Sequence, residues 1–258
     1  GVLRHIIGRI GQSGWMIILV TATEQLPHKE KWVEKLTERI PQVETIVHNV
    51  NGKRTNVILG PKNNILYGDG TITDHIKDLQ FTLSPHSFFQ VNPEQTTVLY
   101  DQALTYADLK GDETVIDAYC GTGTISLFLA HKAKHVIGIE IVEPAIINAR
   151  ENAKRNGYDN TEFIVADAAV EMPKLYKAGV RPDVIVFDPI RAGCKEEVLT
   201  SAAGMEPKRI VYVSCNPATM ARDIEILTHY GYELQEVQPV DMFPMTAHVE
   251  AVALITKI

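Results

Sequence analysis

Residues 114–124 read Thr114-Val115-Ile116-Asp117-Ala118-Tyr119-Cys120-Gly121-Thr122-Gly123-Thr124. A short apolar run ends at an acid, two glycines follow, and a helical pattern begins at Thr124. Glycines between a strand and a helix let the backbone approach a ligand closely. The stretch therefore predicts a strand, a ligand-binding turn and a helix, which together form one unit of an α/β fold.

Regular alternation of strand and helix patterns surrounds this turn, from residue 93 to the C-terminus. The expected strands are 114–118, 135–140, 161–166, 183–187 and 210–214, and the expected helices are 93–107, 124–131, 143–156, 196–203 and 218–229. Two more strands, 232–238 and 249–257, follow with no helix between them. This order predicts a doubly wound, Rossmann-like α/β sheet of seven strands that is parallel apart from an antiparallel strand at its end.

The first 84 residues show a different pattern, which predicts a smaller α+β domain. Strand-like runs occupy 3–10, 15–23, 43–50 and 56–59, and one amphipathic helix is expected at 28–40. Turn signals at Asn51-Gly52 and Gly60-Pro61 separate these runs. We therefore divide the chain into residues 1–84 and residues 85–258.

Composition limits the class of protein. The chain has 258 residues, 45% of them hydrophobic, which suffices for one sizeable α/β domain and a smaller attachment. No apolar run approaches the roughly 18 residues of a membrane span. The three cysteines form no C-x-x-C pair, so we expect neither a disulfide framework nor a metal or iron–sulfur site in this chain. These features favour a cytoplasmic protein, and a monomer is the default expectation.

The charge balance bears on possible partners. A net charge of −7 argues against a general nucleic-acid binder, so any basic surface for a polyanion must be local. The chain begins at Gly1 rather than at a methionine, and we expect it to be a fragment of a longer protein.

The glycine turn and the next two strand ends predict a cofactor site. Gly121 belongs to the turn, and Glu140 ends the second strand, where an acid can accept hydrogen bonds from both ribose hydroxyls of an adenosine. Asp167 follows the third strand, where adenine lies in such folds. A dinucleotide and S-adenosylmethionine both fit this pattern. The third glycine of the dinucleotide fingerprint is absent, and Asp117 together with the terminal strand pair favours S-adenosylmethionine.

Three more residues predict a reactive site at the same edge of the sheet. Asp188 follows the fourth strand, although an acid there is also a common helix cap. Cys215 lies between a strand and a helix N-terminus, a position that favours a thiolate. Glu250 opens an apolar strand, where burial without a partner is costly; a solvated strand end is the alternative.

Taken together, the motifs resemble the RNA uracil-5-methyltransferases, which make 5-methyluridine in tRNA and 23S ribosomal RNA. The similarity covers roughly residues 85–258, with Ser-Cys-Asn-Pro-Ala-Thr as its most specific part. The matching segments are 88–92 (Phe-Phe-Gln-Val-Asn), 117–123, 138–140 (Gly-Ile-Glu), 188–191 (Asp-Pro-Ile-Arg), 214–223 (Ser-Cys-Asn-Pro-Ala-Thr-Met-Ala-Arg-Asp), 241–244 (Asp-Met-Phe-Pro) and 248–250 (His-Val-Glu).

The resemblance implies roles for individual residues. Cys215 matches the nucleophile and Glu250 the general base. The positions that match cofactor-binding residues are Gln90, Tyr119, Glu140 and Asp188. It also implies S-adenosylmethionine as methyl donor, S-adenosylhomocysteine as product and an RNA substrate, with 23S ribosomal RNA expected over tRNA. Residues 1–84 are similar to part of the family's central RNA-contacting domain.

The chain also departs from the family pattern. Ile190 replaces the second proline of Asp-Pro-Pro-Arg, which makes the turn less rigid. The family's N-terminal β-barrel and the cysteine cluster of its iron–sulfur members are not in this sequence, so unaided RNA affinity is in question.

Three other classes compete with this interpretation. An amino-methyltransferase would carry an aromatic residue where this chain has Arg191, and it would give Cys215 no role. A non-catalytic RNA-binding module would transfer no methyl group to RNA. A dehydrogenase would need the complete glycine fingerprint.

Overall fold

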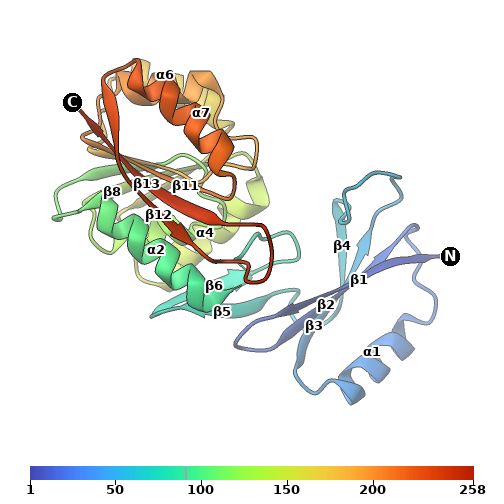
Figure 1. Cartoon of the computed structure of the whole chain (residues 1–258). Helices are drawn as coiled ribbons and strands as arrows, with labels where there is room; N and C mark the ends of the chain where they lie inside the picture. Colours follow the sequence, from blue (N-terminus) through green and yellow to red (C-terminus); the bar gives the residue numbers. More distant parts are fainter. Residues whose placement is uncertain (91) are drawn as a thin grey trace. The chain divides into compact units, whose positions relative to one another are not determined.

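The computed structural model describes residues 1–90 and 92–258 and divides them into two compact units, Gly1–Ser87 and Phe88–Ile258 (Figure 1). The division falls a few residues beyond the position expected from the sequence. No helix in the described ranges has the length and apolar character needed to cross a membrane.

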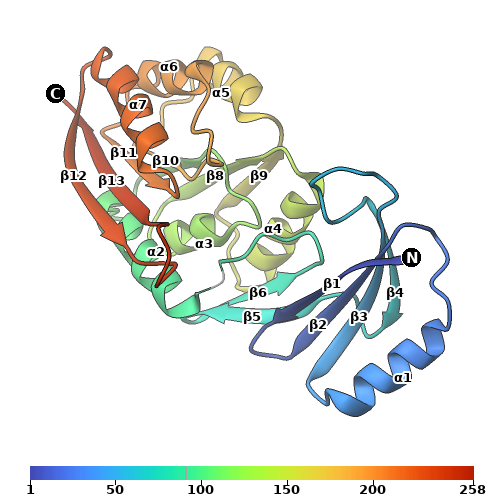
Figure 2. The ribbon, with the colours of Figure 1, turned by 45° about the vertical axis from the view of Figure 1, so that its right-hand side comes forward.

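The first unit is a four-stranded sheet with one helix packed on it (Figure 2). Its elements are β1 (Leu3–Ile10), β2 (Trp15–Thr21), α1 (Lys29–Arg39), β3 (Val43–Val50), β4 (Lys62–Tyr67) and a separate hairpin of β5 (Ile72–Ile76) and β6 (Leu79–Leu83). The sheet order is β1-β2-β3-β4, with only β2 and β3 parallel. Helix α1 is thus the crossover between parallel strands, and its apolar side covers β3 and β4.

The segment 56–59, predicted as a strand, is a loop in the structure. The Asn51 side chain donates hydrogen bonds to the carbonyl oxygens of Val57 (2.7 Å) and Ile58 (2.9 Å). These bonds fix the segment locally, and both apolar side chains stay exposed. Strands β4, β5 and β6 were not predicted. Polar residues interrupt the apolar pattern of β4 and β5, whereas the alternating Leu79, Phe81 and Leu83 of β6 were a strand signal that the sequence reasoning missed.

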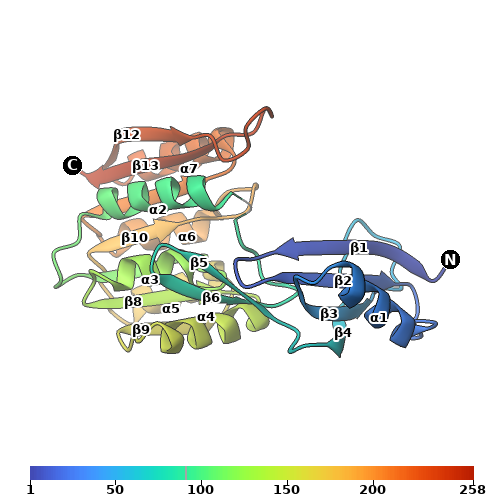
Figure 3. The ribbon, with the colours of Figure 1, turned by 90° about the horizontal axis from the view of Figure 1, so that it is seen from below.

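The second unit is a seven-stranded sheet between two layers of helices (Figure 3). Its strands are β7 (Thr114–Asp117), β8 (His135–Glu140), β9 (Thr161–Val165), β10 (Val184–Phe187), β11 (Arg209–Ser214), β12 (Tyr232–Val240) and β13 (Glu250–Lys257). Its helices are α2 (Pro93–Ala107), α3 (Thr124–Ala130), α4 (Glu143–Arg155), α5 (Ala168–Lys177), α6 (Glu196–Gly204) and α7 (Pro217–Thr228). Helices α5, α6 and α7 bury one face of the sheet, and α2, α3 and α4 lie on the other (Figure 2).

The sheet order is β12-β13-β11-β10-β7-β8-β9. Only β13 is antiparallel, and it is inserted between β11 and β12, so the antiparallel strand lies second from the edge of the sheet and not at its end as predicted. The chain winds in one direction from β7 through β9 and in the other from β10 onwards, so the switch point lies between β7 and β10. Ligands of open α/β sheets bind beyond the carboxyl ends of the strands at such a point.

Helix α5 was not predicted from the sequence. Pro173 lies inside it and removes one backbone hydrogen bond, which is unfavourable in an isolated helix. The buried Met172 belongs to the core beneath α5, and the helix packs closely along α6. Tertiary packing therefore outweighs the local propensity.

Candidate active site

The glycine turn follows β7 at the switch point. Gly121 (φ +54°) and Gly123 (φ +81°) adopt the left-handed conformation that favours glycine. A side chain at Gly121 would meet nothing within 4 Å, whereas one at Gly123 would press on Ala149 and Phe163. The first glycine therefore leaves open space above the turn for a ligand, and the second allows close packing of helix α3.

Asp117 lies fully buried beneath this turn. Ser126 Oγ donates to Oδ2 of Asp117 at 2.6 Å, whereas Oδ1 has no hydrogen-bond partner among the described residues. Burial raises the pKa of Asp117 to about 6, and Glu140 adds to the rise, although the Ser126 hydrogen bond opposes it. A buried carboxylate oxygen without a partner is a suitable acceptor for a ligand donor or a cation.

Glu140 is the last residue of β8 and stays half-buried. The backbone N–H of Val142 donates to its Oε1 at 2.9 Å, which fixes the carboxylate at the strand end. Tyr119, also half-buried, packs against the core beneath α5 and α6, and burial raises the pKa of its hydroxyl. Tyr119 is thus part of the segment that forms the glycine turn, and Glu140 ends the strand that pairs with β7.

Asp167, predicted to bind the cofactor, has structural partners on both oxygens. Oδ1 accepts from Ala169 N at 2.9 Å, which caps helix α5, and Oδ2 forms a 2.9 Å ion pair with Lys195. Lys195 holds the pKa of the Asp167 carboxyl below its usual range. These contacts account for an acid at this position, and its cofactor role stays a prediction.

Gln90 is buried in the segment that leads into helix α2. Two residues later, Asn92 caps α2 through Gln95 N and donates to the carbonyl oxygen of Met242 at 3.2 Å. That bond attaches the segment to the loop between β12 and β13, which leads to Glu250. Val91, part of the predicted motif, lies outside the described residues.

The strand register brings Cys215 and Glu250 together. Ser214 ends β11 and pairs with Ala251 in the antiparallel β13, so Cys215 and Glu250 each adjoin this pair, and the Glu250 carboxyl lies close enough to raise the pKa of the Cys215 thiol. Cys215 is half-buried, whereas Glu250 is only 4% exposed. Two residues 35 positions apart in the sequence are therefore neighbours at the carboxyl edge of the sheet.

The electrostatics of Cys215 differ from the prediction. Burial raises the pKa of its thiol, and the acids Glu250 and Asp188 raise it further. The Arg191 side chain, within hydrogen-bonding reach of the thiol, acts in the opposite direction. Burial and the two nearby acids therefore oppose the thiolate that the helix N-terminus was expected to favour, and the role of Cys215 stays a prediction.

The two acids also hold their protons more tightly than usual. Burial raises the pKa of Glu250, although Arg191 opposes this, and burial raises the pKa of Asp188 well above its usual range. Glu250 and Asp117 add to the effect on Asp188. A carboxyl with a raised pKa next to a thiol is an arrangement suited to proton transfer.

The turn 188–194 is tied to helix α7 by hydrogen bonds. Its Arg191 carbonyl oxygen accepts from Asn216 Nδ2 (3.0 Å) and Thr219 Oγ1 (3.3 Å). Its Ala192 carbonyl oxygen accepts from Arg222 at 2.9 Å. These bonds connect the segment that carries Asp188 and Arg191 to the helix that begins beside Cys215.

Asp223 is the centre of this connection and was missed by the sequence reasoning. It is fully buried, and its Oδ2 accepts from Cys194 N (2.7 Å) and Tyr212 Oη (2.6 Å). Its Oδ1 accepts twice from the guanidinium of Arg222. The available signal was an acid on the apolar side of the helical pattern, between Met220 and Ile224.

The other two cysteines are buried in the fold. The Cys120 sulfur lies against the backbone of Gly138, where a Cβ added to the glycine would be 3.0 Å from it. Cys194 Sγ lies 3.7 Å from Tyr212 Oη. Burial raises the pKa of both thiols, that of Cys194 to about 12. Across residues 1–90 and 92–258, no group of three or more His, Cys, Asp or Glu side chains is arranged to hold a metal ion.

The seven-stranded order, the glycine turn and the acids at the strand ends define the class of Rossmann-like methyltransferase folds. Within that class, the chain belongs to the family described as tRNA (Uracil-5-)-methyltransferase, whose model matches residues 16–258.

Curated relatives agree with this assignment. An uncharacterized RNA methyltransferase of Halalkalibacterium halodurans is 56% identical over 257 residues, which cover 99% of this chain and 56% of that protein. One of Bacillus cereus is 55% identical over 260 residues, again covering 56% of the relative. The chain thus spans a little over half the length of these relatives.

A solved structure is similar over almost the whole chain. The Pyrococcus abyssi tRNA (uracil-54, C5)-methyltransferase, in complex with S-adenosyl-L-homocysteine, superposes with a TM-score of 0.81 and 30% identity. The match covers 99% of this chain and 60% of that one.

Proposed function

We propose that this chain is the catalytic part of an enzyme that transfers a methyl group from S-adenosylmethionine to carbon 5 of a uridine in RNA. The observation that carries the proposal is the proximity of Cys215 and Glu250, which adjoin the Ser214–Ala251 pair at the carboxyl edge of the sheet, with Asp188 and Arg191 nearby. Family membership and the Pyrococcus abyssi enzyme support it.

The residues of the glycine turn fit the methyl donor. S-adenosylmethionine carries an ammonium group and two ribose hydroxyls, all of which can donate hydrogen bonds. The partnerless Oδ1 of Asp117 and the half-buried carboxylate of Glu140 are acceptors of the required kind, and the backbone at Gly121 leaves room. We propose that these residues hold the donor together with Gln90, Tyr119 and Asp188. When bound, the donor supplies an electrophilic methyl group on a sulfonium.

Cys215 serves as the nucleophile in this proposal. Carbon 5 of uracil is a weak nucleophile, and addition of the Cys215 sulfur to carbon 6 makes carbon 5 enolate-like, so that it can accept the methyl group. Such covalent catalysis replaces one difficult step with easier ones. The thiol first gives its proton to solvent water, and Arg191 stabilises the resulting thiolate.

Glu250 completes the cycle. After methylation, carbon 5 carries both a methyl group and a hydrogen. Glu250 removes that hydrogen as a proton, the carbon–sulfur bond breaks, and the thiolate is released. General base catalysis of this kind contributes about 10²–10⁴-fold to the rate. The uridine must leave its stack to reach a half-buried sulfur, so we expect a looped or flipped nucleotide.

Which RNA is methylated is part of the proposal. We expect 23S ribosomal RNA over tRNA, although the family description and the Pyrococcus abyssi enzyme both name tRNA. The preference for ribosomal RNA, a monomeric state and a cytoplasmic location remain predictions.

The test uses tritiated S-adenosylmethionine with unmodified 23S ribosomal RNA and, separately, unmodified tRNA. We expect label in 5-methyluridine with 23S RNA, and loss of transfer in Cys215→Ser. Label in any other nucleoside, or full transfer by Cys215→Ser, would contradict the proposed chemistry. Transfer to tRNA alone would correct the substrate and leave the chemistry intact.

A further inference from the structure

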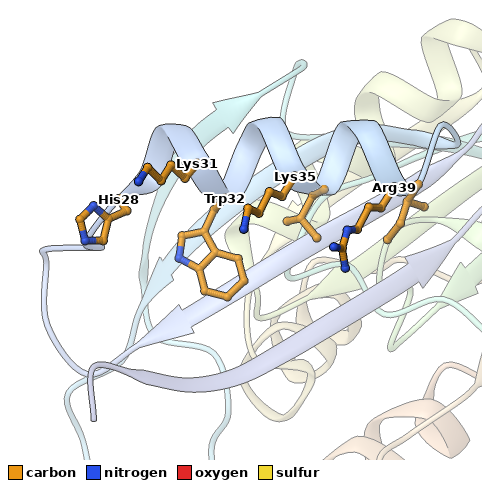
Figure 4. A pocket seen from close by; sticks show the side chains of 7 residues that line it. His28, Lys31, Trp32, Lys35 and Arg39 are labelled. Carbon is orange, nitrogen blue, oxygen red and sulfur yellow. The ribbon is translucent and has the colours of Figure 1, made fainter.

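A groove runs along helix α1 in the first unit, remote in sequence from the residues described above. Its hollow has a volume of about 400 Å³ and is lined by residues of α1 and its two flanks (Figure 4). The lining residues are His28, Lys31, Trp32, Lys35, Leu36, Arg39 and Ile40. Three of these side chains are permanent cations and one is a tryptophan, and no acidic side chain lines the groove.

The charges of α1 are sorted between two flanks of the helix. Lys31, Lys35 and Arg39 follow one another at four-residue intervals, which places them along one line. A glutamate precedes each of these cations in the sequence, so Glu30, Glu34 and Glu38 form a second line along the helix, and none of them lines the groove. Among the ion pairs of the described residues, none uses any of these three cations. The cationic line is therefore available to a ligand.

Trp32 supplies a flat apolar surface beside that line. Figure 4 shows its indole extending from α1 on the same side as Lys35 and Arg39. It packs in part against the core formed by Ile17 and Leu19, and it remains partly exposed. Packing holds the ring in place, so a planar ligand can stack on it at little cost in side-chain entropy.

A local row of cations beside a fixed aromatic ring, on a chain with a net charge of −7, suits a polyanion that carries flat rings. We propose that this groove, lined by Lys31, Trp32, Lys35 and Arg39, binds a single-stranded segment of the substrate RNA. The three cations contact successive phosphates and a base stacks on Trp32. The inference rests on the proposed function, since it takes RNA as the substrate.

Stacking is tested by the fluorescence of Trp32. The chain has two tryptophans, so Trp15→Phe leaves Trp32 as the only one. Titration of that variant with a 12-nucleotide oligouridylate should quench its emission, and polyglutamate of equal charge should not. Unchanged emission at RNA concentrations that saturate binding would overturn the proposal. Equal quenching by polyglutamate would assign the groove to an acidic protein segment and would also overturn it.

The cations are tested by charge removal. The triple variant Lys31→Ala, Lys35→Ala, Arg39→Ala is compared with a control that removes three exposed lysines of the second unit, Lys132, Lys134 and Lys177. Three lost phosphate contacts should reduce the slope of log K against log salt by about 2, and affinity at 0.1 M salt on the order of 100-fold. The control variant should change the salt slope and the affinity much less. Equal changes in the control and groove variants would overturn the proposal.

Methyl transfer separates this inference from the proposed function. The groove variant should raise KM for RNA and leave kcat unchanged, whereas Cys215→Ser should abolish transfer and retain the quenching of Trp32. If the variant leaves KM and the salt slope unchanged while wild type methylates RNA, only the groove assignment fails. Because the three side chains are exposed, substitution by alanine, a good helix former, should leave α1 intact, which circular dichroism checks.

Discussion

Replacement of Asp223 by asparagine should loosen the turn that carries Asp188 and Arg191. The Asp223 carboxylate receives four hydrogen bonds, two from Arg222 and one each from Cys194 N and Tyr212 Oη. Asparagine offers one oxygen and one NH₂ group, so two of these donors lose their acceptor. The NH₂ group will face Arg222, because that side chain is 51% exposed and can bond to water instead.

The magnitude follows from these contacts. The bonds from Tyr212 and Cys194 persist but lose the negative charge of their acceptor, which roughly halves their strength. Together with the lost Arg222 contacts, we expect a decrease of about 2–3 kcal/mol in the free energy of unfolding, since a hydrogen bond to a charged group contributes about 1.5–3 kcal/mol. Urea denaturation measures this value, and Glu225→Gln on the exposed side of α7 is the control, expected within about 0.5 kcal/mol.

A second assay connects the same change to function. Cys215 is the half-buried cysteine and the other two are buried, so iodoacetamide should alkylate it selectively in the folded protein. With its turn loosened, Arg191 should stabilise the thiolate less, and alkylation at a fixed pH should slow several-fold. A stability change under 0.5 kcal/mol, or unchanged alkylation of a destabilised variant, would refute this account of Asp223.

Three further perturbations have defined outcomes. Glu250→Gln removes an acid that raises the pKa of the Cys215 thiol, so the pH profile of iodoacetamide alkylation should move to lower pH; the RNA should still be methylated but be released slowly from its bond to Cys215, and a shift of the profile to higher pH would contradict the assignment. The folded state without ligand binds the Asp117 proton more tightly (pKa about 6) than the unfolded chain does. The contribution of Asp117 to the free energy of unfolding should therefore fall by about 2–3 kcal/mol as the pH rises from about 4 to about 6. Asp117→Asn should remove that share of the pH dependence in urea denaturation, and an unchanged profile would show that Asp117 does not cause it. Gly193→Ala should lower stability by about 1–3 kcal/mol, because φ is +78° there and the new methyl would lie 2.6 Å from Arg222 and Asp223; a neutral result in the same assay would exclude this strain.

The second unit could be predicted in detail because its signals are local. Apolar strands bounded by glycines and acids, alternating with amphipathic helices, fix both the elements and their parallel order. Helix α5 was the exception, since Pro173 hides a helix that the neighbouring α6 supports. In the first unit, polar residues obscure β4 and β5, and the Asn51 side chain fixes the loop at residues 57–58 through hydrogen bonds that no short pattern records.

In the candidate site, too, local sequence patterns predicted where a residue lies but not the properties that depend on distant parts of the chain. The place of Cys215 at the end of β11 followed from its own neighbours in the sequence. Its protonation could not be predicted in this way, because the acids that raise the thiol pKa are Asp188, which follows β10, and Glu250, which opens β13. Likewise, neither partner of Asp167 was predicted, because its cap of α5 depends on a helix that the sequence pattern hides and its ion pair with Lys195 depends on the fold.

The most direct test of the central chemistry is the intact mass of the protein after incubation with S-adenosylmethionine and RNA that contains 5-fluorouridine. Fluorine replaces the hydrogen that Glu250 would remove, so the last step stops and the bond between enzyme and RNA should persist. The account predicts a species with the mass of protein, RNA and one methyl group, whose linkage maps to Cys215 and which Cys215→Ser does not form. A covalent species linked through another residue, or methylation of ordinary RNA with no such species from the fluorinated RNA, would contradict it.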